Sequence, residues 1–216
     1  MNLYLVRHGQ TEWNLSQLAQ GHTDVHLDEV GLEQAALVGM AFESSTVQKV
    51  LTSDLQRARR TAEQIACSAN ANLVTLPELR ERSFGDMEGA PYAEIRKGFQ
   101  ALEALGEDPL AIRLGGGESA YDVWDRVKRV TQILEESTYD TVVVTHGGTC
   151  GILLAQLLKG NPESSRSFVF GNTSITQLER KPTGVWSLVR YNDTSHLASP
   201  GAPMVDTDNA LPSKQI

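Results

Sequence analysis

A chain of 216 residues with a formal net charge of −8 and 40% hydrophobic residues has the length and composition of one soluble α/β domain. The acidic balance argues against nucleic acid and against an anionic membrane surface as partners. No apolar run reaches the roughly 18–20 residues of a membrane-spanning helix, and the first residues lack the pattern of a secretory leader. The sequence therefore predicts a cytoplasmic protein.

Strand-like and helix-like patterns alternate along the chain. Apolar or β-branched runs predict strands at 3–6, 49–52, 72–75, 141–145, 173–179 and 185–191. Helical spacing of apolar residues predicts helices at 28–42, 53–68, 119–137 and 147–158. The inner face of the first helix is expected to carry Leu32, Ala35, Ala36, Gly39 and Met40. This order predicts a three-layer α/β/α sandwich with a mainly parallel central sheet of about six strands.

The remaining segments predict how the domain is bounded. Residues 1–197 are expected to form a single domain. Within it, the weakly patterned stretch of about 86–118 is interpreted as a lid or insertion over the site, with a short helix near 92–99 and a fragment near 101–105. Residues 198–216 read as a C-terminal tail without a core of its own. Cys67 and Cys150 are expected to be buried free thiols.

Two predicted strands end in a histidine followed by glycine. Arg7-His8-Gly9 follows the first strand, and His146-Gly147 follows the β-branched run at 141–145. Ligands of open α/β sheets bind outside the carboxyl ends of the strands, so both imidazoles should meet at one edge. Arg57 is expected in the first turn of a helix, whose amino end favours anions. Guanidinium groups, imidazoles and amide donors together indicate a phosphate site.

A histidine at such a site can also supply chemistry. A neutral imidazole is a competent nucleophile near pH 7, and its attack on phosphorus would give a phosphohistidine. The leaving alcohol needs a proton, and Glu81 is the candidate donor, with Glu78 and Glu88 close to it in sequence. Arg7, Arg57 and His146 would neutralise charge on the phosphoryl oxygens. This scheme requires no metal and no other cofactor.

The run Arg7-His8-Gly9-Gln10-Thr11-Glu12-Trp13-Asn14 resembles the signature of the histidine phosphatase superfamily, which includes the phosphoglycerate mutase-like proteins. Further stretches are similar to its later motifs: 53–58, 81–85, 117–119 and 145–148. The resemblance implies His8 as the phosphorylated nucleophile and Glu81 as the proton donor. It carries Arg7, Arg57 and His146 over as their catalytic partners. It places Asn14 in the phosphate pocket, and we also expect substrate contacts from Thr11, Gln20, Gly21 and Gly147.

Three functions are compatible with these residues. The favoured one is a phosphomonoesterase that hydrolyses small phosphorylated metabolites, with sugar phosphates, phosphoserine, phosphoglycerates and α-ribazole phosphate as open candidates. The alternative within enzymes is a cofactor-dependent phosphoglycerate mutase. Relatives with mutase activity tend to have longer insertions than the roughly 30 residues between Gly85 and Gly117, which favours hydrolysis. The third is a non-catalytic phospholigand-binding module, which the retention of both histidines disfavours.

Several other features carry less information. His22 and His26 are four residues apart but lie in a predicted loop, so no metal site is expected. Arg80, Arg82 and Arg113 are interpreted as surface arginines, with contact to substrate as the alternative. The oligomeric state is left open, with a homodimer as one arrangement.

Overall fold

A computed structural model describes residues 1–198, so the predicted tail at 198–216 lies outside the described residues except for Ala198. The described chain forms one six-stranded sheet in the order β3-β2-β4-β1-β5-β6. The strands are β1 (Asn2–Arg7), β2 (Lys49–Thr52), β3 (Asn72–Thr75), β4 (Thr141–Thr145), β5 (Ile175–Arg180) and β6 (Trp186–Asp193). β1 to β4 run parallel to one another, whereas β5 is antiparallel to both of its neighbours, β1 and β6. The predicted mainly parallel α/β sheet is confirmed.

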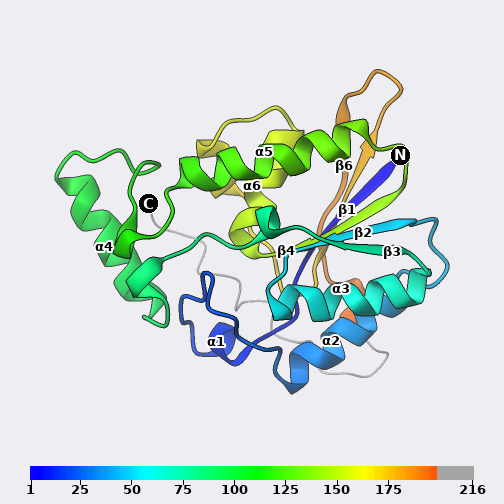
Figure 1. The fold of residues 1–216 in the computed structure, drawn as a ribbon, viewed down its shortest axis with the longest axis horizontal. Coiled ribbons are helices and arrows are strands. Elements are labelled where there is room, and N and C mark those ends of the chain that lie inside the picture. The colour runs from blue at the N-terminus through cyan, green and yellow to red at the C-terminus, as the bar shows by residue number, and fades with distance from the viewer. Residues whose placement is uncertain (199–216) are drawn as a thin grey trace.

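Helices cover both faces of this sheet (Figure 1). α2 (Glu29–Met40) and α3 (Gln56–Ala69) lie on one face, and α5 (Ala120–Glu136) and α6 (Gly147–Leu157) lie on the other. The short α1 (Glu12–Leu15) and the longer α4 (Tyr92–Ala104) lie beyond the carboxyl ends of the strands. Short 3-10 turns complete the chain: η1 (Pro77–Leu79), η2 (Gly85–Met87), η3 (Leu114–Gly116), η4 (Glu163–Ser167) and η5 (Ser195–Leu197).

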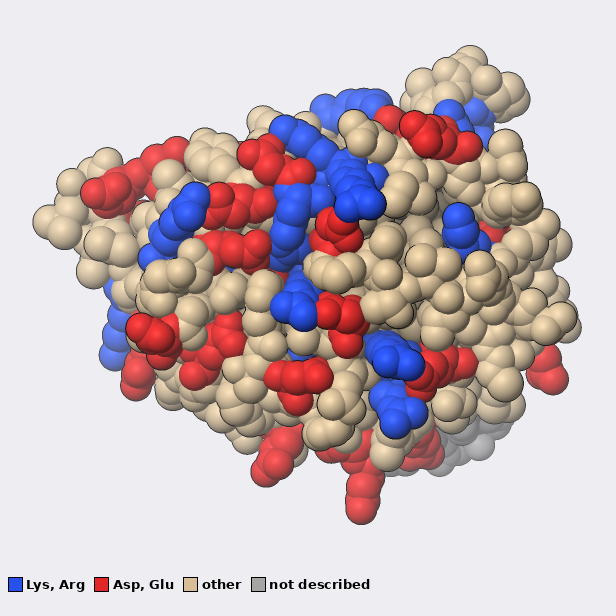
Figure 2. All heavy atoms as spheres, in the orientation of Figure 1, with Lys and Arg blue, Asp and Glu red and all other residues tan. Residues whose placement is uncertain are grey.

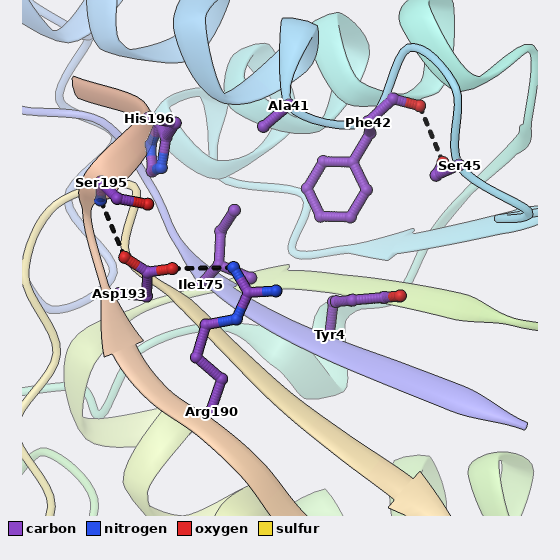
Figure 3. A pocket seen from close by; sticks show the side chains of 9 residues that line it. All are labelled: Tyr4, Ala41, Phe42, Ser45, Ile175, Arg190, Asp193, Ser195 and His196. Atoms are coloured by element: carbon purple, nitrogen blue, oxygen red, sulfur yellow. Dashed lines mark hydrogen bonds and ion pairs between the residues drawn. The ribbon is translucent and has the colours of Figure 1, made fainter. Parts of the chain in front are cut away.

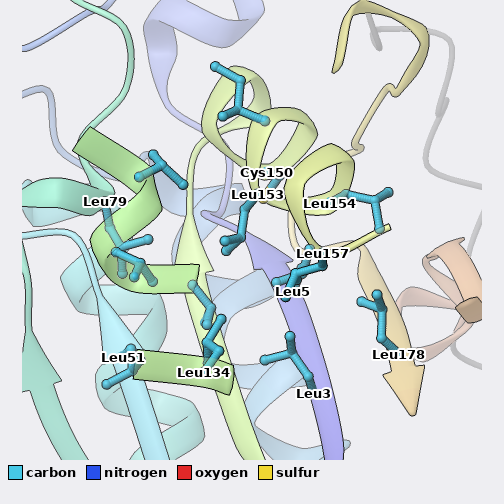
Figure 4. Packing of buried hydrophobic residues seen from close by; sticks show 14 of the residues in the cluster. Leu3, Leu5, Leu51, Leu79, Leu134, Cys150, Leu153, Leu154, Leu157 and Leu178 are labelled. Carbon is cyan, nitrogen blue, oxygen red and sulfur yellow. The ribbon is translucent and has the colours of Figure 1, made fainter. Parts of the chain in front are cut away.

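The strands divide their side chains between two cores. Leu3 and Leu5 of β1 face α5 and α6, where they pack with leucines of α6 such as Leu153 (Figure 4). Val6, from the alternate set, packs on the other face with Ile65 of α3. Each large apolar side chain removed from water in this way contributes about 1.5–3 kcal/mol. Two filled cores therefore fix the direction and register of β1 and β4, which carry the histidines.

The inner face of α2 differs from the prediction. Ala35 and Gly39 are buried as predicted, but Ala36 is exposed and Leu32 and Met40 are 55% and 63% exposed. The helix buries Gly31, Gln34 and Val38 in their place. The cause is a close approach to the segment after β1, because a Cβ at Gly31 would lie 2.0 Å from the carbonyl oxygen of Gln10. The Gln34 side chain also accepts a hydrogen bond from the Gln10 backbone at 2.9 Å. Helix α2 thus supports the histidine loop with its smallest residues.

Four further expectations need correction. Ser53 and Asp54 are expected to cap helix α3, but the helix begins at Gln56 with Leu55 as its N-cap residue, and the Asp54 carboxylate pairs with Arg80. The predicted break near 100 is absent, and 92–104 is one helix. Strand β5 begins two residues later than predicted, because Thr173 has a positive φ of 53° that no strand accommodates. Cys67 is exposed on α3, whereas Cys150 is buried as expected.

The surface carries charges of both signs. Figure 2 shows acidic and basic side chains intermingled over one face of the molecule. Many of them form surface ion pairs, such as Arg59 with Glu63 and Lys159 with Glu135. Among the helices of residues 1–198, none combines the length and the apolar character that crossing a bilayer requires.

Candidate active site

Two histidines stand at the carboxyl ends of the central strands β1 and β4. Because Arg7 pairs with Thr145 in the parallel register, His8 and His146 follow at the same edge of the sheet. Their ring centroids are 5.1 Å apart, and their exposed fractions are 3% and 0%. The structure thus brings together the two strand-end histidines that the sequence singled out.

The protonation state of His8 follows from one contact. Its Nδ1 lies 2.7 Å from the carbonyl oxygen of Gly9. A carbonyl oxygen only accepts, so Nδ1 carries the ring proton of the neutral imidazole and Nε2 keeps the lone pair. Burial lowers the pKa of His8 well below its ordinary value, and the charges of Arg57 and Arg7 lower it further. At neutral pH the side chain is therefore an uncharged imidazole, the form in which an imidazole nitrogen is nucleophilic.

Arg57 connects the second histidine to the loop after α1. Its side chain is fully buried, and its Nε donates to Nδ1 of His146 at 3.2 Å. Its two terminal nitrogens donate to the carbonyl oxygens of Thr23 and Gly21, each at 2.8 Å. Burial lowers the pKa of Arg57 to about 10, so the guanidinium is still protonated at neutral pH. A fixed positive charge therefore stands between the histidines and this loop.

Several buried polar atoms at the site have no hydrogen-bond partner within residues 1–198. They are Nε2 of His146, Nε of Arg7 and Oε1 of Gln20. Because Nδ1 of His146 accepts from Arg57, the ring proton of its neutral form lies on Nε2, which is then an unpaired donor. Arg7 uses Nη1 to bind the carbonyl oxygen of Phe170 at 2.8 Å. Two unpaired donors beside guanidinium groups suit an anion with several acceptor oxygens.

Glu81 lies at the amino end of α6. Its carboxylate accepts hydrogen bonds from the backbone nitrogens of Gly148 at 3.0 Å and Arg82 at 2.8 Å. Its negative charge acts on the guanidiniums of Arg7 and Arg57, opposing the lowering of their pKa by burial. Glu81 is thus within the same electrostatic neighbourhood as the predicted phosphate site.

The two neighbouring glutamates have other contacts. Glu78 pairs with Arg129 at 2.6 Å. The Glu88 carboxylate accepts from the backbone nitrogens of His22 and Thr23 and from the hydroxyl of Ser83, at 2.7–3.0 Å. Glu88 therefore ties the loop that holds Arg57 to the turn after Glu81. Of the three glutamates considered from the sequence, Glu81 is the one bonded to the amino end of α6.

The predicted substrate contacts divide into two groups. Gly21 and Gln20 lie in the loop that binds Arg57. Gly147 lies beside the Arg7 guanidinium, since a Cβ added at Gly147 would be 3.6 Å from Nε of Arg7. Thr11 and Asn14 instead form a capping box at the start of α1, in which Oδ1 of Asn14 accepts from the Thr11 backbone and hydroxyl at 3.1 Å. The structure gives this pair a local role, and their contact with substrate stays a prediction.

Two site residues escaped the sequence reasoning. The side-chain nitrogen of Asn172 donates to the backbone oxygen of His8 at 2.9 Å and so supports the histidine from the loop before β5. Tyr92, the first residue of α4, packs against the ring of Phe84 in the turn after Glu81, and burial and the charge of Glu81 raise the pKa of its hydroxyl to about 12. An aromatic residue opening a weakly patterned helix gives no sequence signal of this kind.

The other singled-out side chains are engaged elsewhere. Arg80 pairs with Asp54, and Arg113 pairs with Asp122. Arg82 donates to the carbonyl oxygen of Glu118 at 2.7 Å and lies over the ring of Phe99. Within residues 1–198, no three histidine, cysteine, aspartate or glutamate side chains are grouped as a metal site.

A separate hollow of about 280 Å³ lies between α2, β1 and the end of β6 (Figure 3). It is lined by Tyr4, Phe42 and Arg190 among others, but by neither of the two site histidines. Arg190 points toward Asp193 and pairs with it at 2.7 Å. This hollow therefore lacks the unpaired cations that the first site offers.

We expect the free energy of unfolding to decrease as the pH falls below about 6.5. The pKa values of His8 and His146 are lowered mainly by burial, and that of His196 is lowered in the same way. The unfolded chain therefore binds protons that the folded chain does not, at a cost of about 1.4 kcal/mol per pH unit for each histidine that stays neutral. Urea unfolding at pH 7.5, 6.5 and 5.5 measures this slope. His8→Asn should reduce this slope by the contribution of one histidine. An unchanged slope would contradict the assignment of His8 as neutral in the folded chain.

A family model described as the histidine phosphatase superfamily (branch 1) matches residues 3–194 of this chain. The chain belongs to the histidine phosphatase superfamily. This membership confirms the resemblance seen in the first motif and accounts for the paired strand-end histidines.

Relatives within the histidine phosphatase superfamily include phosphatases. The uncharacterized phosphatase PhoE of Bacillus subtilis is 34% identical, over 90% of this chain and 95% of its own. Phosphoglycerate mutase-like protein 4 of Arabidopsis thaliana is 32% identical, over 92% of this chain and 88% of its own. The solved structure of mycobacterial glucosyl-3-phosphoglycerate phosphatase with VO3 has a TM-score of 0.78 and 29% identity, over 89% of this chain and 99% of its own. This histidine phosphatase is accordingly a phosphoric monoester hydrolase.

Proposed function

We propose that this histidine phosphatase hydrolyses small phosphorylated metabolites of the cytoplasm through a phosphohistidine on His8, with Glu81 as the proton donor. The observation that carries the proposal is the state of His8. It is a buried, neutral imidazole whose Nδ1 is held by Gly9, so that Nε2 is the nucleophilic atom. The unpaired donors of Arg7 and His146 lie at the same edge and suit the oxygens of a phosphate.

The reaction would proceed in two displacements. In the first, Nε2 of His8 forms a bond to phosphorus while the ester oxygen leaves and takes a proton from Glu81. In the second, water attacks phosphorus, Glu81 takes back a proton, and the phosphorus–nitrogen bond breaks. Arg7 and Arg57 neutralise charge on the phosphoryl oxygens in both steps, and Nε2 of His146 donates a hydrogen bond to them. The scheme assigns this neutralisation to protein side chains, so it needs no metal or other cofactor.

Proton donation by Glu81 requires its protonated form in the complex. Its carboxylate accepts hydrogen bonds from Gly148 and Arg82, and a phosphate dianion bound nearby would favour the protonated form. The substrate of the proposal is a small phosphate monoester, and we propose that its alcohol part contacts Tyr92 of α4. We assign substrate selection to the segment between Ser83 and Glu118, which contains this helix.

The test is phosphate release from a panel of monoesters with EDTA present, run beside a mutase assay on 3-phosphoglycerate. The panel contains sugar phosphates, phosphoserine, phosphoglycerates and α-ribazole phosphate. We expect release that is insensitive to the chelator. Mutase turnover with negligible phosphate release would show that the enzyme is a mutase and not a hydrolase. The Arabidopsis relative is named as phosphoglycerate mutase-like, so this alternative is tested in parallel. Binding of phosphate without either reaction would indicate a non-catalytic module.

A further inference from the structure

An ion pair of α5 lies behind the proposed proton donor. Glu118, just before the helix, accepts from Arg126 through both carboxylate oxygens, at 2.8 Å and 3.0 Å. The side chains are 22% and 19% exposed, so the pair is largely shielded from water. Although burial opposes it, the hydrogen bond and charge of Arg126 lower the pKa of Glu118, which keeps the carboxylate ionised at neutral pH.

This pair binds the backbone on both sides of Glu81. Arg126 donates to the carbonyl oxygens of Glu78 and Glu81, each at 2.8 Å. The Glu118 carboxylate accepts from the backbone nitrogen of Ser83 at 3.0 Å. The segment that carries Glu81 is therefore fixed before, at and after that residue by two side chains that themselves hold each other.

Stability of the fold does not by itself explain why an ion pair occupies this place. A shielded ion pair is often no better for stability than apolar side chains of similar volume. A general acid, in contrast, works only within hydrogen-bond reach of the leaving oxygen, and a 1 Å displacement can cost about 100-fold in rate. Neither Glu118 nor Arg126 is bonded to His8, Arg7, Arg57 or His146. Their contacts lead to the backbone of Glu81.

We propose that Glu118 and Arg126 are positioning residues that hold the Glu81 carboxyl in place for proton transfer to the leaving alcohol. The inference rests on the proposed function, in which Glu81 is the acid. Their loss should therefore impair the protonation step selectively and leave phosphate binding largely intact.

Leaving-group dependence measures this step. The departing p-nitrophenolate is stable without a proton, whereas a departing alkoxide is not, so only alkyl phosphates require the acid. The second displacement is common to both substrates, so the first is compared through kcat/KM, which reports the steps up to release of the alcohol. In Arg126→Met we expect kcat/KM to fall 10- to 100-fold for the fastest alkyl phosphate of the panel and less than about 3-fold for p-nitrophenyl phosphate. Glu118→Gln keeps the shape of the side chain and should give the same split, meaning a larger loss on the alkyl phosphate than on p-nitrophenyl phosphate, but a smaller one. This variant tests the proposal even if Arg126→Met does not fold.

Arg129→Met is the matched control. Arg129 lies one turn further along α5 and also pairs with a glutamate, at 2.6 Å, but it does not contact Glu81. For both substrates the rate constants should stay within about 2-fold of those of the unmodified enzyme, since exposed ion pairs contribute little. A comparable split in this variant would show that any disturbance of α5 has the same effect, and the proposal would fail.

A double variant separates the inference from the function on which it rests. Glu81→Gln should show the same split at larger amplitude, and adding Arg126→Met should then have almost no further effect, because both act on one step. Equal losses on both substrates in Arg126→Met, with Glu81→Gln still selective, would overturn the positioning role alone. No split in Glu81→Gln would overturn Glu81 as the acid, and the positioning role with it.

Discussion

Replacing His8 with alanine is expected to reduce phosphate release by at least about 10⁴-fold, because no other group can take the place of a lost covalent nucleophile. His8 is the imidazole whose lone pair is directed to Nε2 by its bond to Gly9. The measurement is kcat on the best monoester of the panel, together with detection of an acid-labile, base-stable phosphoryl group on the unmodified enzyme.

Two controls make this result specific. His26→Ala changes an exposed histidine of the loop before α2 and should leave kcat unchanged. Binding of inorganic phosphate should persist in His8→Ala, since Arg7, Arg57 and His146 are retained. Residual turnover above about 1% would place the nucleophile elsewhere.

Arg57→Met should lower kcat/KM by about 10²–10³-fold, the range for loss of a preorganised charge donor. Methionine retains much of the apolar stem but removes the guanidinium, which in this site bonds His146 and two loop carbonyls at once. Arg57→Lys should recover only part of the loss, because an ammonium cannot reproduce the planar fork.

A second readout is the stabilisation by inorganic phosphate. A ligand that binds only the folded state raises its stability, so phosphate should raise Tm of the unmodified enzyme and have a much smaller effect on Arg57→Met. The matched control is Arg60→Met, three residues along α3, where the side chain is 63% exposed and pairs with Glu63. An equal response to phosphate in Arg57→Met would mean that this guanidinium is not part of the anion site.

The sequence predicted those parts of the site that depend on local pattern. Apolar runs that end in His8 and His146 locate two strand ends, and the parallel sheet then brings them together without further information. Arg57 could be placed because its helix has a clear apolar face. Glu81 could be named but not distinguished physically from Glu78 and Glu88, because that choice depends on contacts from α5 and the loop before α2.

What the sequence missed depends on contacts between distant segments. The outward position of Leu32 follows from the close approach of Gly31 to Gln10, which no helical periodicity encodes. Asn172 supports a residue 164 positions earlier in the chain. Glu118 could be noted within a motif, but its partnership with Arg126 behind Glu81 becomes apparent only when α5 is packed on the sheet.

The reversed direction of β5 decides which part of the chain reaches the nucleophile. A strand parallel to β1 would enter the sheet at the opposite edge, and its first residues would lie about the length of β1 away from His8. Because β5 is antiparallel, the segment before it lies beside the end of β1, where the Phe170 carbonyl oxygen accepts a hydrogen bond from Arg7 and the Asn172 side chain donates one to the His8 carbonyl oxygen. The reversed direction of this one strand thus brings the loop before β5 into contact with Arg7 and His8, so that this loop becomes part of the site.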